Sequence, residues 1–400
     1  MKKNVKRIGS ALMAGALAVS LTACGGGASE ENTSGSGEFK ESKIALAFYT
    51  DSGPAVASSQ AFLDAVAETL NTEFTYVTFS QTDEATNVAT VQQLIASGVD
   101  GIIGTMDLGT PAILEECEAA GVYYAGYVCD FETSYTASYD EVFGNDTFLG
   151  TIADGQTSDN VQTGTITFES ILEYNEAHPD DPVEHVALTI FPEWAYPTQR
   201  LAAEQFIAAV EEYNATAETP ITVDPLDEES DVLQFAPIDS TYFSKHPGID
   251  GIVSFAAGTG FVYPTMVSAG VDDELKLFTV GVEGGEEENF GSAGTQTYQQ
   301  ILVTPIETIV YPLVLLENAI NGAEFSDMPE NAERIDTTQF VVNSDEDMEK
   351  FLSNLYSTGD FADSLLTAED VANLTAVANP DATYAGLVET VQGFSIDSIE

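Results

Sequence analysis

The chain repeats a long unit, and this repeat limits the folds open to it more than any other feature. The phrase Gly-(Val/Ile)-Asp-Gly-Ile-(Ile/Val) occurs at 98–103 and again at 248–253. After each copy come a loop, a helix-like stretch ending in Ala-Gly-Val, and a further apolar run, at 123–129 and 276–282. The repeated unit is about a hundred residues long, which is typical of two similar domains and too long for a solenoid repeat.

Strand-like and helix-like stretches alternate within each unit. Upstream of the repeated phrase, the apolar runs 44–49 and 186–191 correspond to each other, and each is followed by a helical pattern. The phrase itself is apolar at consecutive positions, as in a parallel strand that is covered on both faces. Gly98 and Gly121 mark the ends of helices. This alternation predicts parallel α/β units with right-handed crossovers.

The N-terminus has the pattern of an export signal. Four basic residues lie within the first seven, and the apolar stretch Ile8–Val19 that follows is too short to span a bilayer. Leu21–Cys24 then places small residues before a cysteine. Residues 1–23 therefore resemble a bacterial lipoprotein signal peptide, in which Cys24 becomes the lipidated first residue; the alternative is an uncleaved anchor with a chance cysteine. Residues 24–42, rich in Gly, Ser and Glu, are expected to form a flexible tether.

Composition excludes several classes of function. The chain has 66 acidic against 11 basic residues, a formal charge of −55, and such a surface repels the phosphates of nucleic acids. The three histidines are scattered and no EF-hand-like loop is present, so neither a metal site nor a cofactor is predicted. Cys117 and Cys129 lie too far apart along a helix and the next strand for a disulfide, and we expect two buried free thiols.

Several segments resemble sugar-binding type I periplasmic-binding proteins. In the first unit these segments are YTDSGP, TNVATVQQLIASGVDGIIG, AGYVCD and VFGNDTFLG; in the second they are TQRLAAEQF, PGIDGIVSFAAGTG and FTVGVEGG. The resemblance covers about 43–342. It implies an α/β fold of two doubly wound parallel-sheet lobes, joined by a three-stranded hinge, that close over a small molecule.

The resemblance also implies the domain boundaries. The N-terminal lobe would comprise 43–144 and 303–335, and the C-terminal lobe would comprise 145–302 and 336–400. The chain would cross between lobes near 143–146, return near 299–305, and cross again near 335–343. The tail from 345 onward is expected to be a helical extension of the C-terminal lobe.

In open parallel sheets, ligands bind in the crevice at the carboxyl ends of the strands. The loops that follow the predicted strands, and the hinge, therefore hold the candidate contacts for a ligand. These are Tyr49, Asp51, Asp107, Asp130, Trp194, Arg200, Thr259, Glu283 and Gln300.

Arg200 is the sharpest of these candidates. It opens a helix, where a cation opposes the helix dipole, and in the resembling family an arginine at this place binds the sugar. The alternative for Arg200 is an ion pair at the protein surface. The other arginine of this part of the sequence, Arg334, lies outside the predicted crevice loops. Asp130 and Glu283 are expected to accept hydrogen bonds from sugar hydroxyls, or else to be solvated acids. Trp194 either stacks on a ligand face or anchors its loop.

The resemblance implies a lipid-anchored solute-binding protein of an ABC importer, on the extracytoplasmic face of the bacterial membrane. It would capture a small polar solute, most simply a sugar, and deliver it as a monomer to the permease. No Gly-x-Ser-x-Gly, Walker loop or paired nucleophile and base is found, so an enzyme is not expected. The segments 256–260 and 50–53 also resemble nucleoside-binding lipoproteins, and a ligand sensor that presents a solute to a membrane receptor is a further alternative.

Overall fold

The structure is a computed structural model and describes residues 37–131, 139–155, 157, 160–291 and 296–399. All of these belong to one compact unit, Gly35–Glu400. The predicted signal peptide, Cys24 and most of the tether lie outside the described residues. Within the described part of the chain, no helix is both long and apolar enough to cross a membrane.

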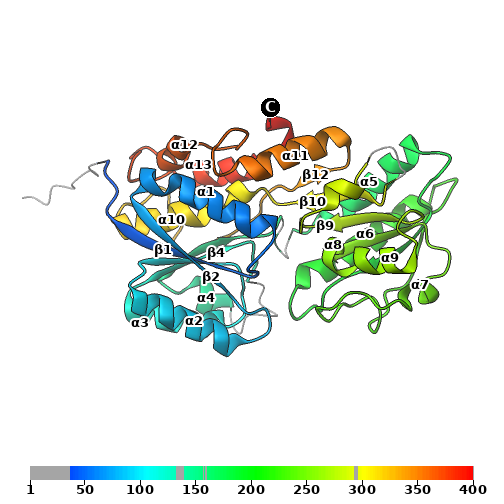
Figure 1. Cartoon of the computed structure of the whole chain (residues 1–400). Helices are drawn as coiled ribbons and strands as arrows, with labels where there is room; N and C mark the ends of the chain where they lie inside the picture. Colours follow the sequence, from blue (N-terminus) through cyan, green and yellow to red (C-terminus); the bar gives the residue numbers. More distant parts are fainter. Residues whose placement is uncertain (1–36, 132–138, 156, 158–159, 292–295, 400) are drawn as a thin grey trace, which may run out of the picture. The chain divides into compact units, whose positions relative to one another are not determined.

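The first unit of the repeat forms a six-stranded parallel sheet, here called sheet A, with the order β11-β5-β4-β3-β1-β2. Helices cover both of its faces (Figure 1). Its strands are β1 (Ser42–Phe48), β2 (Thr72–Thr78), β3 (Gly101–Gly104), β4 (Tyr123–Tyr127), β5 (Phe148–Ile152) and β11 (Arg334–Ile335). Its helices are α1 (Pro54–Leu70), α2 (Glu84–Ser97), α3 (Thr110–Ala120), α4 (Tyr139–Phe143) and α10 (Val310–Asn321).

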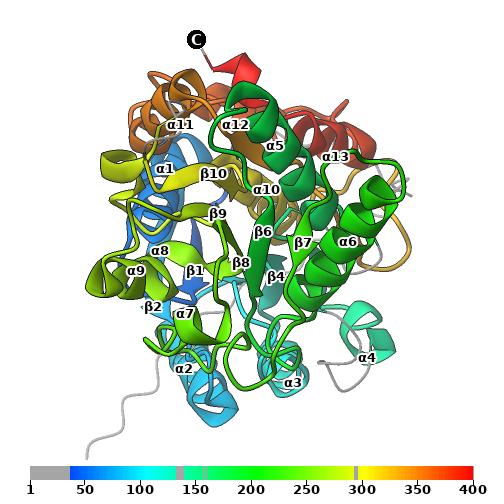
Figure 2. The same ribbon diagram turned by 90° about the vertical axis from the view of Figure 1, so that its right-hand side faces the viewer.

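The second unit forms sheet B, with the order β12-β10-β9-β8-β6-β7, in which β12 alone is antiparallel. Helices α5 and α6 lie on one face of this sheet and α8 and α9 on the other (Figure 2). The strands are β6 (His185–Thr189), β7 (Thr222–Val223), β8 (Gly251–Ala257), β9 (Lys276–Val280), β10 (Tyr298–Val303) and β12 (Phe340–Val342). The helices are α5 (Thr163–Ala177), α6 (Pro197–Asn214), α7 (Tyr242–Lys245), α8 (Gly258–Phe261), α9 (Tyr263–Ala269) and the 3-10 turn η1 (Glu286–Asn289).

The predicted repeat is confirmed, because each strand of sheet A has a counterpart at the same position in sheet B. The duplicated phrase performs one structural task in both. Its first glycine, Gly98 or Gly248, has a φ of 84° or 80°, which suits glycine better than other residues. The aspartate of the phrase then accepts a backbone N–H at the start of the neighbouring strand: Asp100 from Lys43 at 2.8 Å, and Asp250 from His185 at 2.9 Å. The phrase is therefore part of the scaffold.

The chain crosses between the sheets three times. The second crossing follows β10 and leads into η2 (Ile306–Ile309), and the third joins β11 to β12, as predicted. The first crossing, however, follows β5 and does not lie near 143–146. The boundary predicted at residue 144 was wrong because Phe148–Ile152 pairs with β4 as an inner strand of sheet A.

The C-terminal extension is helical, as predicted, and comprises α11 (Asp345–Ser357), α12 (Ala368–Asn373), α13 (Tyr384–Gln392) and η3 (Ile396–Ser398). Its assignment to the C-terminal lobe needs correction. Helices α12 and α13 pack on α1 and α10 of sheet A, while α11 contacts both α1 and β12 (Figure 1). Burial of apolar side chains explains this packing, because Val371 and Leu387 are fully buried in one core with Phe62 and Leu313.

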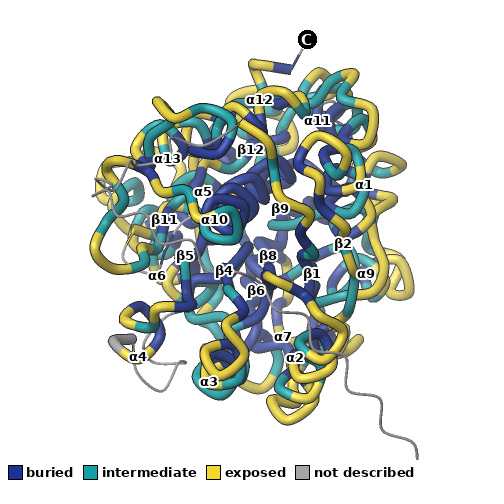
Figure 3. Tube along the Cα trace, turned by 90° about the vertical axis from the view of Figure 1, so that its left-hand side faces the viewer, coloured by how far each residue is buried: buried dark blue, intermediate teal, exposed yellow. Residues whose placement is uncertain are grey.

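Helix α10 shows the effect of this cover. It lies between sheet A and the extension, and its residues from Val310 to Asn318 are all buried, so that it forms a dark core segment in Figure 3. We call sheet A with α1–α4, α10, α12 and α13 lobe A, and sheet B with α5–α9 lobe B.

Candidate functional site

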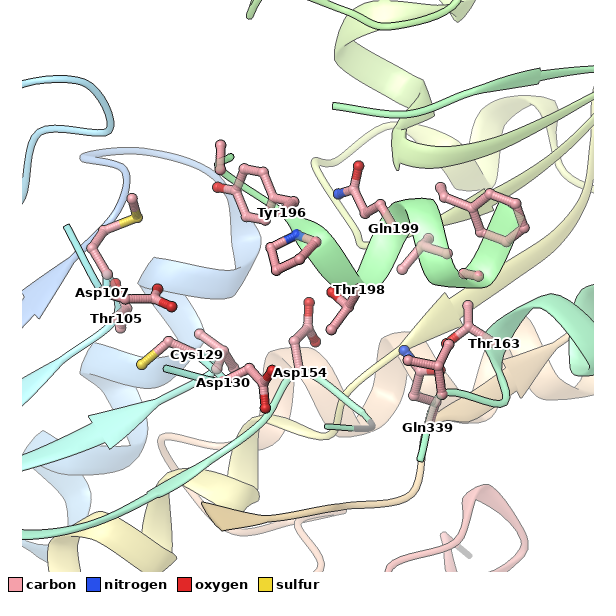
Figure 4. Close-up of a pocket in the computed structure, with 18 residues that line it drawn as sticks. Thr105, Asp107, Cys129, Asp130, Asp154, Thr163, Tyr196, Thr198, Gln199 and Gln339 are labelled. Atoms are coloured by element: carbon pink, nitrogen blue, oxygen red, sulfur yellow. The ribbon is translucent and has the colours of Figure 1, made fainter. Parts of the chain in front are cut away.

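A pocket lies where the carboxyl ends of the strands of both sheets come together (Figure 4). It encloses roughly 880 Å³ of empty space, counting the solvent at its mouth. Lobe A contributes the loops after β3 and β4, lobe B contributes the first turn of α6 and the ends of β8 and β9, and the crossing segments supply the floor.

Two of the predicted acids, Asp107 and Asp130, line the lobe A side of this pocket. Oδ2 of Asp107 accepts the backbone N–H of Phe131 at 3.2 Å. Asp130 forms an ion pair with Arg334 of β11, with 3.4 Å between Oδ1 and Nη1. Their side chains are only 10% and 11% exposed, so this pair is largely removed from water.

The loop that carries Asp130 has an unusual backbone. Val128 and Phe131 have φ values of 49° and 52°, in the left-handed region that is a true outlier for a β-branched valine. Such backbone persists only where the surrounding structure enforces it, and it is concentrated at functional sites. The strain here positions Cys129 and Asp130 on the pocket wall.

Both predicted free thiols are confirmed. Cys117 and Cys129 are buried and are not joined to each other. Burial raises the pKa of Cys117 to about 12 and that of Cys129 well above its ordinary value, so both remain protonated. Cys129 contributes the sulfur seen beside Asp130 in Figure 4.

Asp154 is a site residue that sequence reasoning missed. It directly follows β5, on the first crossing, and its carboxylate accepts the hydroxyl of Thr304, on the second crossing, at 2.6 Å. The side chain is open to the pocket, yet protein surrounds it, and this desolvation raises its pKa. An acid at the carboxyl end of a strand is the sequence pattern that predicts such a residue. The pattern was not recognised because the predicted lobe boundary at 144 separated this strand from the N-terminal lobe.

The lobe B wall is neutral. It is formed by Tyr196, Thr198 and Gln199 around the start of α6, with Pro197 as the first helical residue. Gln199 is held by the backbone N–H of Phe191, which donates to Oε1 at 2.7 Å. These side chains offer hydroxyl and amide groups to a ligand, and Tyr196 adds an aromatic surface.

Arg200 does not line this pocket. Its guanidinium donates to Glu228 at 2.9 Å and lies 3.4 Å from Glu193, and the side chains of both acids are more than 60% exposed. The geometry supports the alternative of a surface ion pair. Arg334, expected to lie outside the crevice, instead braces the pocket residue Asp130.

Tyr49 and Glu283 are not part of the pocket lining, but they lie near enough to each other for the charge of Glu283 to act on the Tyr49 hydroxyl. Burial, Asp154, Tyr196 and Glu283 are among the causes that raise the pKa of Tyr49, so its hydroxyl remains a donor close to both lobes. Glu283 accepts the backbone N–H of Gly260, and burial raises its pKa, with a further contribution from Glu286.

The structure places the remaining candidates away from the pocket lining. Asp51 is exposed, and Thr259 lies beside Tyr298. Gln300 is fully buried within β10, and its amide has no hydrogen-bond partner among the described residues. Trp194 is 51% exposed and packs on Phe235, with 5.8 Å between ring centroids.

Nothing in the described ranges suggests a metal centre, since no cluster of three or more His, Cys, Asp or Glu side chains there could hold an ion. The polar groups of the pocket can donate and accept hydrogen bonds. Carboxylates accept hydrogen bonds from hydroxyl or ammonium groups strongly and directionally. The arrangement is suited to binding a small polar molecule between the lobes.

Comparison of the sequence with family models and with curated proteins finds no match. Solved structures do match the fold. A solute-binding protein of an ABC transporter from Agrobacterium vitis, bound to α-D-tagatopyranose, has a TM-score of 0.57 at 14% identity, over 78% of this chain and 98% of that one.

Two further structures give the same picture. A solute-binding protein from Burkholderia graminis, in complex with D-arabinose, has a TM-score of 0.54 at 15% identity, over 78% of this chain and 98% of that one. One from Bacillus halodurans with bound myo-inositol has a TM-score of 0.53 at 14% identity, over 81% and 99%. The chain therefore has the fold of the type I periplasmic-binding proteins.

Proposed function

We propose that the chain is the solute-binding protein of an ABC importer and captures a small polar solute of the sugar class between its lobes. The observation that carries this proposal is the pocket at the carboxyl ends of both sheets, with acceptors on one wall and hydroxyl and amide groups on the other. The similar structures named above hold D-arabinose, α-D-tagatopyranose and myo-inositol. Binding, and not catalysis, is the proposed activity.

A thermal-shift panel tests this proposal. Monosaccharides, polyols, nucleosides and amino acids are each added to the protein from Cys24 onward, and binding is confirmed by calorimetry. A ligand present at 100 times its Kd stabilises the folded state by about 2.7 kcal/mol, which shifts the melting temperature by several degrees. A panel in which only amino acids bind, or nothing binds, would contradict the proposal.

The aromatic groups beside the pocket favour a second candidate, a nucleoside. The ring centroid of Phe235 lies 5.8 Å from that of Trp194 and 6.4 Å from that of Tyr196, and Phe191 stacks on Phe235. Flat bases stack on such surfaces. A stronger shift with nucleosides than with any sugar or polyol would select this function.

The N-terminal pattern supports a lipid anchor at Cys24, which would hold the protein as a monomer at the extracytoplasmic face beside its permease. The first strand begins at Ser42, so residues 24–41 precede the described sheets. We expect Cys24→Ala to leave the ligand affinity unchanged but to release the protein from the membrane fraction. Incorporation of labelled palmitate into this variant would disprove the assignment of Cys24.

A further inference from the structure

The charge on the pocket walls is one-sided. Among the described residues, Asp107, Asp130 and Asp154 line the pocket, and no lysine or arginine does so. Arg334 lies behind Asp130 and pairs with it, and this is one positive charge against three carboxylates. The neutral lobe B wall adds no cation.

The rest of the chain has no further cation to offer this site. After Arg7 the sequence contains seven lysines and arginines, all of them in the described part of the chain. Each has a partner other than Asp154: Lys40 with Asn321, Lys43 with Glu73, Arg200 with Glu228, Lys245 with Asp227, Lys276 with Asp181, Arg334 with Asp130, and Lys350 with Glu346. No protein ammonium or guanidinium therefore compensates Asp154.

Asp154 also has few donors of its own. A carboxylate can accept about four hydrogen bonds, and within the described residues Thr304 is the one partner of this carboxylate. Figure 4 shows the side chain in the open part of the pocket, facing Thr198. The surrounding protein raises the pKa of Asp154, while the side chain itself remains exposed to the open pocket.

Closure over a ligand would make this imbalance worse. Burying a carboxylate without a compensating charge is costly, and a neutral solute brings hydroxyl donors but no charge. An ammonium group brings both a positive charge and three donors. The walls of the pocket therefore favour a solute with an amine over its neutral counterpart.

Building on the function proposed above, we infer that the solute is a small polyhydroxylated amine, such as an amino sugar, whose ammonium group binds the carboxylate of Asp154. Thr304 would keep that carboxylate oriented from the second crossing. The amine would be bound at the hinge, between the two walls.

Sugars that share one skeleton provide the test. D-Glucose, D-glucosamine and N-acetyl-D-glucosamine differ in charge at a single position, and the galactose series repeats the comparison. Calorimetry should give a Kd for the free amine that is at least about 10-fold lower than the Kd of either neutral form. One hydrogen bond to a charged group accounts for a difference of this size. In Asp154→Asn, which retains an acceptor for Thr304, the ratio between the affinity of the amine and the affinities of the neutral forms should fall to about one.

Asp273→Asn is the matched control, because it removes the same charge from an exposed position on lobe B. It should leave the preference intact. Neutral sugars that bind the wild type as tightly as their amines would overturn the inference while leaving the proposed function standing. A preference that persists in Asp154→Asn would overturn the role of Asp154, and a complete lack of binding by all sugars would remove the proposed function as well.

Discussion

The two lobes share one strand order and differ in what they present to the cleft. Lobe A places carboxylates there, held by a strained loop and a buried ion pair, whereas lobe B presents neutral groups from the first turn of α6. Asp100 and Asp250, inside the repeated phrase, do the same structural work in both lobes. The comparison teaches that the repeat preserves the scaffold at one end of the strands, while the loops at the other end are free to diverge.

The lobes also differ in which helices cover their outer sides, away from the cleft. Lobe A is covered by α12 and α13, and α10 is buried beneath them, whereas lobe B is covered by its own helices together with α11 and the end of the chain, whose Phe351 and Ile399 join its core. The extension also reaches the third crossing: Thr337 donates to the carbonyl of Val391 at 2.9 Å, and Thr338 to that of Phe394 at 2.7 Å. Lobe A and the hinge therefore depend on the end of the chain.

The largest effect should come from the ion pair of lobe A. Arg334→Ala leaves the Asp130 carboxylate buried without its cation, and we expect a loss of about 3–5 kcal/mol in the free energy of unfolding. Urea denaturation measures it. Adding Asp130→Asn to this variant should recover much of the loss, because the uncompensated charge is then gone. A loss below about 1 kcal/mol would mean that the pair is solvated like a surface pair.

The second-largest loss of stability should come from disrupting helix α13, which covers lobe A. Leu387→Ala removes a fully buried side chain of α13 from the core shared with α1 and α10, and should cost about 2–5 kcal/mol. Glu389→Ala, on the exposed side of the same helix, should leave thermal unfolding nearly unchanged. Equal melting temperatures for both variants would show that the extension adds little to the core.

The pH dependence of stability should distinguish the lobes. In lobe A, burial is the largest cause that raises the pKa of Glu317 from 4.5 to about 7. Its contribution to stability is thus present below about pH 4.5 and is lost as the pH rises through 7, on the order of 3 kcal/mol at most. In lobe B, burial opposes the charged form of Asp224, but hydrogen bonds from His185 and His246 outweigh it and lower the pKa, so that its contribution is lost as the pH falls.

Glu317→Gln should therefore flatten the dependence of stability between about pH 5 and 7. Its hydrogen bond from Thr72, at 2.6 Å, can be kept by the amide oxygen. Urea denaturation across this range, with Glu389→Gln as the exposed control, gives the answer. An unchanged slope in Glu317→Gln would assign the pH dependence to other groups.

The smallest change in stability and in affinity should come from replacing Arg200. Arg200→Ala breaks ion pairs with two exposed acids, and such pairs contribute about 0–1 kcal/mol. Once a ligand is known, its Kd should change by less than about threefold, since Arg200 does not line the pocket. A tenfold weaker Kd would restore Arg200 to the site and reverse the contrast with Arg334.

The sequence predicted the scaffold better than the site, for physical reasons. The alternation of strands and helices follows from local apolar patterns that repeat, and Asp107 and Asp130 could be placed because each follows a recognisable strand. Asp154 was missed because β5 was assigned to the C-terminal lobe, although it pairs with β4 in sheet A. The roles of the two arginines were interchanged, because which acid pairs with an arginine is decided by the folded arrangement and not by neighbours in sequence.

The core of lobe A joins the two ends of the described chain. Val66 of α1 and Leu387 of α13 belong to one cluster, although almost the whole of sheet B lies between them in sequence. A chain that emerges with its N-terminus first has therefore completed every strand before this core can close. Contacts of such long separation form slowly, because the intervening loop must first be brought together. A chain that emerges from the ribosome or from an export channel without α13 would carry every strand that the structure describes but an open core in lobe A, exposed to chaperones and proteases until α13 joins it.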